Sequence, residues 1–444
     1  MFRGRILILL LGDLGVFAAS LFLTLLARYG KMPSFDFFTA HLYPFSLIFI
    51  VWLLIFYIAG LYSKEVILKK RNLAPLLFTS QLAASFAAAL FFYLLPVFKI
   101  TPRGNLLLNL LITFVLLWAW RQGAGFLFKK NPESVLLVAV GTEALELAAE
   151  LKHASYGLDV TSHLNLADFE NRFSKEEDLL SFLKDKGISL VIADISGFKM
   201  PRSVSLMYWL NSRQISVLNF GEVYADIFAR VPLVEVSEEW VFKHLAGAGS
   251  RAYLFLKRLM DVVTAFFLGI SSLFLFPLIA LAIKLESRGP VFFRQNRVGK
   301  NGRIFSLLKY RSTYRTEVSA TQGWEKEGEH IYTKTGRFLR KTYLDELPQF
   351  INILKGEMSF IGPRPERPEF VRELSRRILF YHMRLLVPPG LTGWAQINMQ
   401  NDAAAKDAEE KLKYDFYYIK NLSLFLDLRI LLKTVATVLS RSGR

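Results

Sequence analysis

Two adjacent carboxylates, Asp345 and Glu346, are the residues of this chain best suited to chemistry. Nearby cations keep carboxylates ionised, and ionised carboxylates serve as nucleophiles or metal ligands. Arginine forks also pair with phosphate oxygens in bidentate fashion, so the string indicates phosphoryl chemistry. The alternative is a helix start whose N-terminus the two acids stabilise. The flanking cations are Arg337, Arg340, Lys341, Lys355, Arg364 and Arg367.

Long uncharged runs in the first third of the 444-residue chain predict membrane helices. Apolar residues make up 52% of the sequence, and a soluble protein would avoid such runs. A helix needs about 20 residues to cross the hydrocarbon core. We therefore expect a bundle of four transmembrane helices within residues 1–130. Their predicted ranges are 6–27, 43–61, 76–98 and 106–120, the last extending to about 128.

The distribution of charge around these runs predicts how the bundle is oriented. Asp13 lies inside the first run, and we expect a helix–helix contact there, with a minor functional site as the alternative. That run is too long for a cleaved signal peptide. The positive-inside rule places the N-terminus and everything after residue 128 in the cytoplasm, which indicates a multi-pass membrane protein. The orienting cations are Arg3, Arg5, Lys64, Lys69, Lys70, Arg71, Lys129 and Lys130.

Residues 131–235 are predicted to form a cytoplasmic α/β domain with a Rossmann-like, doubly wound parallel sheet. Strand-like runs at 134–140, 190–194 and 215–219 alternate with helical stretches. The first turn holds Gly141 alone, where a dinucleotide site needs several glycines. A role in regulation or assembly is therefore favoured over NAD binding. We expect residues 236–256 to be a linker.

A further uncharged run of 22 residues, 262–283, is long enough to cross a membrane. Both of its flanks are basic, so the positive-inside rule places both ends in the cytoplasm. A re-entrant helix, broken near Pro277, satisfies that rule. The alternative is a fifth span with a proline kink, which would put Asp345 and Glu346 outside the cell.

Residues 251–311 contain 11 Lys or Arg and two acids, a difference of +9 out of +17 for the whole chain. Because this basic band adjoins a membrane segment, we expect it to face anionic lipid headgroups and phosphorylated ligands. No nucleic-acid-binding motif is present, so nucleic acid is not an expected partner.

Seven ordered strings give residues 251–444 a family resemblance. The region resembles the catalytic module of the monotopic polyprenyl-phosphate phosphoglycosyl transferases, the bacterial sugar transferases that initiate exopolysaccharide, capsule and O-antigen assembly. The preceding spans and α/β domain resemble the long-form members. The strings are Lys257-Arg-x-x-Asp261, Gly289-Pro-Val-Phe-Phe-Arg-Gln-Asn-Arg297, Leu308-Lys-Tyr-Arg-Ser312, Leu344-Asp-Glu-Leu-Pro-Gln349, Asn352-Ile-Leu-Lys-Gly356, Met358-Ser-Phe-Ile-Gly-Pro-Arg-Pro365 and Pro389-Gly-Leu-Thr-Gly-Trp-Ala-Gln-Ile-Asn398, continued by Tyr414-Asp-Phe-Tyr-Tyr418 and Asp427.

The resemblance implies a reaction. Asp345 would attack the sugar-linked phosphorus of a UDP-sugar, release UMP and carry the phosphosugar as an acyl phosphate. Undecaprenyl phosphate would then accept it, giving a polyprenyl diphosphate sugar. Mg²⁺ is the expected cofactor, with Asp345 as its ligand, and Glu346 would assist the second step or position the metal. Membrane lipids are expected partners, and the protein is expected to be a homodimer.

The same resemblance implies substrate-binding residues. Arg364 would hold a phosphate, and Arg311, Arg340, Lys309 and Arg297 are further candidates, each with a plain surface or lipid-facing charge as the alternative. The remaining candidate cations, Lys257 and Arg258, are expected to anchor the headgroup region.

Four positions depart from the family pattern, and two rival functions stay open. Phe276 stands where the family commonly has Ser before the proline of the membrane break, and Met399 stands where Gly often follows the asparagine. Tyr310 and Thr313 stand where the family often has Phe and Met. One rival is a glycosyltransferase that moves the sugar alone and so releases UDP. The other is a non-enzymatic membrane assembly or sensing protein. The sequence does not identify the sugar.

Overall fold

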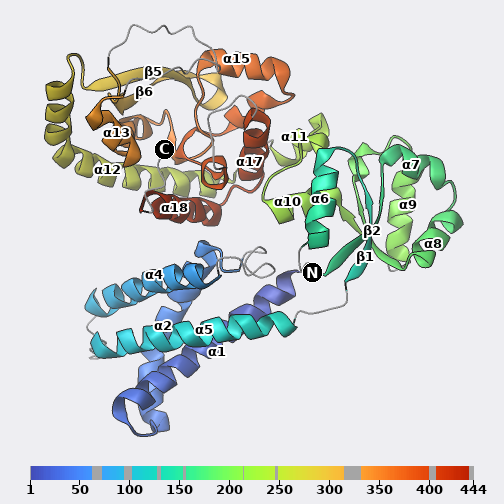
Figure 1. Ribbon diagram of the computed structural model, residues 1–444, viewed down its shortest axis with the longest axis horizontal. Coiled ribbons are helices and arrows are strands. Elements are labelled where there is room, and N and C mark those ends of the chain that lie inside the picture. Colours follow the sequence, from blue (N-terminus) through green and yellow to red (C-terminus); the bar gives the residue numbers. More distant parts are fainter. Residues whose placement is uncertain are drawn as a thin grey trace. The chain divides into compact units, whose positions relative to one another are not determined.

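The structure is a computed structural model that describes residues 2–62, 73–94, 103–127, 132–153, 157–213, 215–245, 249–314, 332–399 and 407–439. The chain divides into two units, Met1–Val223 and Tyr224–Arg444, and each is described by itself. Most of the described residues are helical, as Figure 1 shows.

The four N-terminal helices predicted from apolar runs are all present. They are α1 (Phe2–Tyr29), α2 (Phe35–Ala59), α4 (Leu73–Leu94) and α5 (Arg103–Leu127). Three stretches of them, Ile6–Tyr29, Phe35–Ala59 and Leu73–Leu90, are long and apolar enough to cross a membrane, and α12 (Arg251–Glu286) is the fourth such helix in the described part of the chain. Length and composition therefore support a membrane location.

Asp13 has the helix–helix contact that was expected, and its partner is Arg121. The two side chains form a buried ion pair between α1 and α5. The Tyr62 hydroxyl donates to Asp13 Oδ2 at 2.6 Å, and Arg121 Nη1 donates to the Leu61 carbonyl at 2.8 Å. A charge buried among apolar helices needs such partners. The cations at 64–71 and 129–130, from which orientation was predicted, lie outside the described residues.

The α/β domain contains the predicted parallel sheet. Its four strands are β1 (Glu133–Val138), β2 (Leu158–Leu164), β3 (Ile188–Ala193) and β4 (Ser216–Asn219), in the order β2-β1-β3-β4. The pattern did not predict β2, whose side chains are alternately buried and exposed as at a sheet edge. Figure 1 shows helices on both sides of the sheet. These helices are α6 (Thr142–His153), α7 (Leu166–Arg172), α8 (Glu176–Asp185) and α9 (Pro201–Ser212).

Residues 236–256 were expected to be a linker, and the structure differs there. The segment contains α11 (Glu238–His244) and the start of α12, and it follows α10 (Phe220–Phe228). Trp240 packs against Phe416 of the second unit, with ring centroids 5.9 Å apart, in a core shared with Val231 and Val236. The apolar side chains of this segment are therefore part of the C-terminal core.

The second unit is mostly helical, as predicted, with two small sheets. An antiparallel hairpin joins β5 (Phe292–Val298) to β6 (Ile304–Tyr310), and β7 (Ser359–Ile361) pairs in parallel with β8 (Gly390–Thr392). The helices after α12 are α13 (Lys334–Lys341), η6 (Leu344–Gln349), α14 (Phe350–Lys355), α15 (Pro368–Arg377), η7 (Tyr381–Leu386), α16 (Trp394–Asn398), α17 (Ala408–Lys420) and α18 (Leu424–Leu439).

Helix α12 buries a face that contains both polar and apolar residues, and it exposes an apolar face. Lys257, Asp261 and Ala265 are buried at four-residue spacing, whereas many of the large apolar side chains around them are exposed. The helix was expected to break at Pro277. It continues to Glu286, and Figure 1 shows it bending along its length. A proline removes one backbone hydrogen bond, which bends a helix without ending it.

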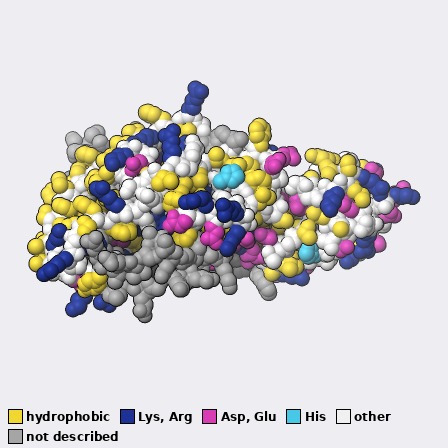
Figure 2. Space-filling model, turned by 90° about the horizontal axis from the view of Figure 1, so that it is seen from above, with side chains coloured by type: hydrophobic (Ala, Val, Ile, Leu, Met, Phe, Trp, Pro, Cys, Tyr) yellow, Lys and Arg dark blue, Asp and Glu magenta, His cyan; other side chains and the backbone are white. Residues whose placement is uncertain are grey.

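The surface seen in Figure 2 carries many exposed hydrophobic side chains, with Lys and Arg between them. Such apolar exposure in a soluble protein would mark an interaction site. The exposed large apolar side chains of α12 include Phe255, Phe266, Phe267, Leu273, Phe274, Leu278 and Leu285.

Candidate active site

The carboxylate pair lies in the short 3₁₀ helix η6, directly after α13. Tyr343 adopts a left-handed backbone conformation, with φ of 56°, and turns the chain between the two helices. The acids are thus in a first helical turn, as the alternative interpretation held. Asp345 is 8% exposed, so its carboxylate lies largely within the protein rather than on the surface.

Glu346 is held by two cations from distant parts of the sequence. Lys309 Nζ, on β6, lies 2.6 Å from Glu346 Oε1, and Arg364 Nη2, in the loop after β7, lies 3.2 Å from the same oxygen. Burial opposes the ionisation of Glu346, but Lys309 and Arg364 outweigh it and hold its pKa at about 2. Glu346 is therefore a fixed anion that orders both cations.

The pKa of Asp345 is shifted in the opposite direction. Burial, reinforced by the charge of Glu346, raises its pKa to about 6, although Lys309, Arg340 and Arg364 act in the other direction. Among the described residues its carboxylate accepts no hydrogen bond. Two neighbouring acids whose pKa values are pushed apart in this way are suited to different roles. Asp345 is thus the carboxylate whose oxygens accept no hydrogen bond from the described residues, and with a pKa of about 6 it is mostly ionised at neutral pH.

The donor set fits a divalent cation that is shared with a substrate. No group of three or more His, Cys, Asp or Glu side chains that could hold a metal occurs among the described residues. Mg²⁺ commonly takes one or two carboxylates together with substrate phosphates, and it keeps several waters. The free oxygens of Asp345 are compatible with that mode of binding.

Two of the five predicted substrate-binding cations contact Glu346, and a third lies within electrostatic reach of Asp345. Arg364 is a third exposed, so it can meet a ligand while contacting Glu346. Arg340 lowers the pKa of Asp345, and its Nη1 donates to the Tyr332 hydroxyl at 2.6 Å. Lys309, Arg340 and Arg364 thus form a cationic group around the carboxylates.

The structure gives the other two, Arg311 and Arg297, a different environment from the predicted one. Arg311 is buried and donates to the carbonyls of Arg288 and Ser287 at 3.0 and 2.8 Å, which ties β6 to the end of α12. Arg297 Nη1 donates to the Pro365 carbonyl at 2.9 Å. Both guanidinium groups satisfy backbone carbonyls that the fold would otherwise leave unpaired.

Lys257 and Arg258 also differ from the expectation of a lipid-headgroup anchor. Lys257 is buried, and its Nζ lies 3.1 Å from Asp427 Oδ2 on α18. Arg258 donates to the carbonyls of Ile353 and Leu354, at 2.7 and 2.8 Å, and so caps the C-terminal end of α14. The motif therefore joins α12 to the rest of the unit.

Sequence reasoning did not single out a buried charged cluster behind Arg364. In it Glu366 pairs with Lys411 at 3.0 Å, and Arg384 pairs with Asp415 at 2.8 Å. Arg297 and Asp415 belong to strings noted in the sequence, but no local pattern indicates the pairing, because the partners in these two pairs lie at least 31 positions apart. We name Arg297, Glu366, Arg384, Lys411 and Asp415 the anchor cluster.

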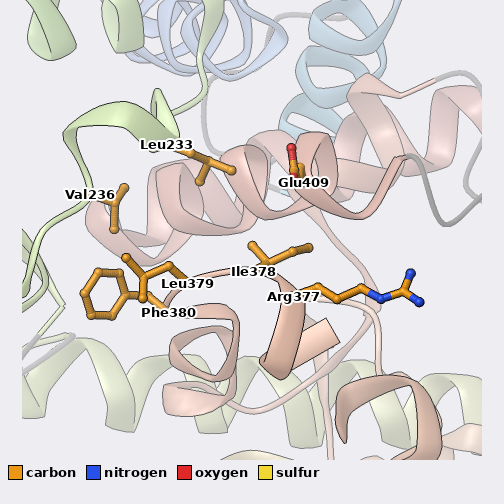
Figure 3. A pocket seen from close by; sticks show the side chains of 7 residues that line it. All are labelled: Leu233, Val236, Arg377, Ile378, Leu379, Phe380 and Glu409. Atoms are coloured by element: carbon orange, nitrogen blue, oxygen red, sulfur yellow. The ribbon is translucent and has the colours of Figure 1, made fainter. Parts of the chain in front are cut away.

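A small pocket of about 210 Å³ lies elsewhere in the second unit (Figure 3). Its lining comes from the segment before α11, from the end of α15 and the turn after it, and from α17. It contains none of the carboxylates or cations described above, and a pocket for a drug-sized ligand is typically about 300–1,000 Å³. The residues are Leu233, Val236, Arg377, Ile378, Leu379, Phe380 and Glu409.

Comparison with known proteins identifies the family. The profile described as "Bacterial sugar transferase" matches residues 252–441. UDP-N-acetylgalactosamine-undecaprenyl-phosphate N-acetylgalactosaminephosphotransferase of Aeromonas hydrophila is 46% identical over 233 residues, which cover 52% of this chain and 53% of that protein. UDP-glucose:undecaprenyl-phosphate glucose-1-phosphate transferase of Escherichia coli is 40% identical over 183 residues, 40% of this chain and 39% of that protein.

A shorter relative is covered almost completely. The uncharacterised sugar transferase EpsL of Bacillus subtilis is 41% identical over 192 residues, which are 43% of this chain and 90% of that protein. By contrast, the chain spans about half the length of the Aeromonas relative. The resemblance and the transferase class inferred from the sequence are confirmed, and the chain belongs to the bacterial sugar transferase family.

Proposed function

We propose that this protein transfers a sugar-1-phosphate from a UDP-sugar to undecaprenyl phosphate, with Asp345 as the covalent nucleophile. The reaction would be the first membrane step of exopolysaccharide, capsule or O-antigen synthesis. The observation that carries the proposal is the pairing of a free, buried Asp345 with a Glu346 that Lys309 and Arg364 hold in place. The names of the relatives support the donor and acceptor classes.

In the first step an Asp345 carboxylate oxygen attacks the sugar-linked phosphorus. The bond from that phosphorus to the oxygen bridging to the second phosphate breaks, and UMP leaves with the electron pair. In the second step a phosphate oxygen of undecaprenyl phosphate attacks the same phosphorus. The acyl phosphate bond breaks, and the Asp345 carboxylate is regenerated.

The cations supply electrostatic stabilisation. Charge spreads over the phosphoryl oxygens in the transition state, and preorganised guanidinium and ammonium groups stabilise it. Arg364 is suited to this role because it is partly exposed and its neighbours Pro363 and Pro365 restrict its backbone. Mg²⁺, held by Asp345 and the diphosphate, would neutralise substrate charge.

The membrane arrangement follows from the same proposal. A cytoplasmic UDP-sugar requires the carboxylates to face the cytoplasm. The exposed apolar face of the bent α12 supports a helix that enters the inner membrane and returns, with its buried face toward the protein. We propose that the protein acts there as a homodimer, with the α/β domain in regulation or assembly.

The test follows the covalent phosphosugar. Full-length protein in nanodiscs is mixed with a UDP-sugar labelled in the phosphate next to the sugar, without acceptor, and the protein is then denatured. We expect label on the wild type and UMP as the nucleotide product. Asp345→Asn should lose label and turnover by roughly 10³-fold or more, because an amide is a poor nucleophile.

Asp185→Asn is the matched control, since it makes the same chemical change at an exposed residue of α8. It should retain label and turnover. Release of UDP would instead identify transfer of the sugar alone. Near-normal turnover of Asp345→Asn would rule out this nucleophile.

A further inference from the structure

The loop that carries Arg364 lies beyond the end of a strand. Strand β7 ends at Ile361, and the next residues up to Arg367 precede α15. The Gly362 N–H donates to the Thr392 carbonyl at 2.9 Å, and the Pro363 carbonyl accepts from the Gly390 N–H at 2.9 Å, which continues the pairing with β8 as far as Pro363. The next backbone pairing is at Glu366, whose carbonyl accepts from the Val298 N–H at 2.9 Å, so Arg364 lies between the two paired positions.

Arg384 fixes that backbone from behind. Its side chain is 2% exposed, and Nη2 donates to the Arg364 carbonyl at 3.0 Å. Nη1 donates to the Tyr381 hydroxyl at 2.8 Å, and Nε donates to Asp415 Oδ2 at 2.9 Å. A guanidinium with three oriented bonds has little freedom to rotate, so the position of the Arg364 carbonyl is tightly defined.

The next two residues of the loop are held by the rest of the anchor cluster. Arg297 donates to the Pro365 carbonyl, and Lys411 lies 3.0 Å from Glu366 Oε1. Burial opposes the ionisation of Glu366, yet Lys411, Arg384 and Arg297 outweigh it and hold its pKa at about 2. These contacts restrain consecutive residues of the loop.

We propose that Arg384, oriented by Asp415, is a positioning residue for catalysis that acts through the backbone of Arg364. The inference rests on the proposed function, in which Arg364 stabilises the transferring phosphoryl group. Arg384 itself contacts neither member of the carboxylate pair in the described structure. A buried ion pair commonly contributes little net stability compared with apolar residues of similar size, which favours a geometric role for this one.

The experiment measures kcat and KM for UMP release by full-length protein in nanodiscs. Arg384→Lys keeps the charge but cannot reproduce the three directed bonds. We expect kcat to fall about 10- to 100-fold with KM little changed, since a shift of about 1 Å in a positioned group costs on the order of 10²-fold. Arg377→Lys, the same change at an exposed residue of α15, is the control and should keep full activity.

A double-mutant cycle separates positioning from structure. In an Arg364→Lys background, Arg384→Lys should reduce kcat by less than about threefold, because the group it positions is already lost. Multiplicative losses would overturn the inference. Full activity of Arg364→Lys would overturn it too, since nothing would be left to position.

A second variant keeps the test decisive if Arg384→Lys does not fold. Arg384→Met/Asp415→Leu removes both charges together and so leaves neither buried and unpaired. It should fold, by thermal unfolding, and still lose about 10- to 100-fold in kcat. Unfolding of both variants would show a stability element and overturn the inference. Failure of the proposed function is distinct, because the wild type would then release UDP or carry no label.

Discussion

The rate of the first half-reaction should fall as the pH is lowered, and the midpoint of this acid limb of the pH–rate profile should report the pKa of Asp345. Burial and Glu346 raise that pKa to about 6. At pH 7.5 about 97% of this carboxylate is ionised, and at pH 5 about 9% is, from the ordinary titration relation. Label transfer to the protein should therefore fall about tenfold between these values. Glu346, with a pKa of about 2, stays ionised throughout and contributes nothing to the limb.

Two substitutions should move this limb in opposite directions. Glu346→Gln removes a negative charge that raises the pKa of Asp345, so the limb moves to lower pH. Lys309→Met removes a cation that lowers it, so the limb moves to higher pH. Because a charge within about 4–6 Å shifts a pKa by about 1–3 units and partial exposure screens it, we expect roughly one unit each way.

The assay measures the initial rate of label capture without acceptor, at pH 5 to 8, each variant normalised to its own plateau. Omitting undecaprenyl phosphate matters, because a phosphate monoester also titrates near pH 6 and would obscure Asp345. Lys355→Met, a change in an exposed cation close in sequence, is the control and should leave the limb in place. A wild-type midpoint near 4, or shifts of the same sign in both variants, would refute this account.

Three further outcomes are expected. Arg364→Lys should lose about 10- to 100-fold in UMP release, because a point charge replaces a planar fork; full activity would show that no fork is needed. A chain beginning at residue 224 should keep activity. A chain beginning at residue 250 should unfold at a lower temperature, because it lacks Trp240 and the loss of a buried Trp costs roughly 3–5 kcal/mol. Equal melting temperatures of the two chains would contradict this. Phe255→Cys and Lys300→Cys, each introduced singly into this Cys-free chain, should react with an impermeant thiol reagent from the same face of the membrane; labelling from opposite faces would establish a true span.

Composition and adjacency were enough to predict the parts of the molecule that depend on local sequence. The apolar runs became helices because length and hydrophobicity alone decide that outcome. The acid pair was evident because its two members are consecutive. Three of the five predicted binding cations do gather around it, through β6, α13 and the loop after β7.

The remaining cations could not be assigned from sequence, because a guanidinium can donate either to a phosphate or to a backbone carbonyl. Arg297 finds its carbonyl 68 residues away, and Asp13 finds Arg121 at a separation of 108. No periodicity connects residues over such distances. The prediction of a linker at 236–256 was wrong for a similar reason. Nothing close to Trp240 in the sequence indicates that its ring packs against Phe416.

Helix α12 links the membrane surface to the chemistry. Two residues of α12 within one helical turn hold the two parts of the site. Arg258 donates to the Ile353 carbonyl near the end of α14, the helix that follows the carboxylate pair. Asp261 accepts from the Phe360 N–H at 2.8 Å, in the strand that leads to Arg364. The opposite face of the same helix is apolar and exposed. Both halves of the candidate site are therefore attached to one turn of the same helix, so a shift of α12 in a bilayer would move them together. An acceptor that arrives through the bilayer would then meet the carboxylates at a fixed depth, which a site built on flexible loops alone would not provide.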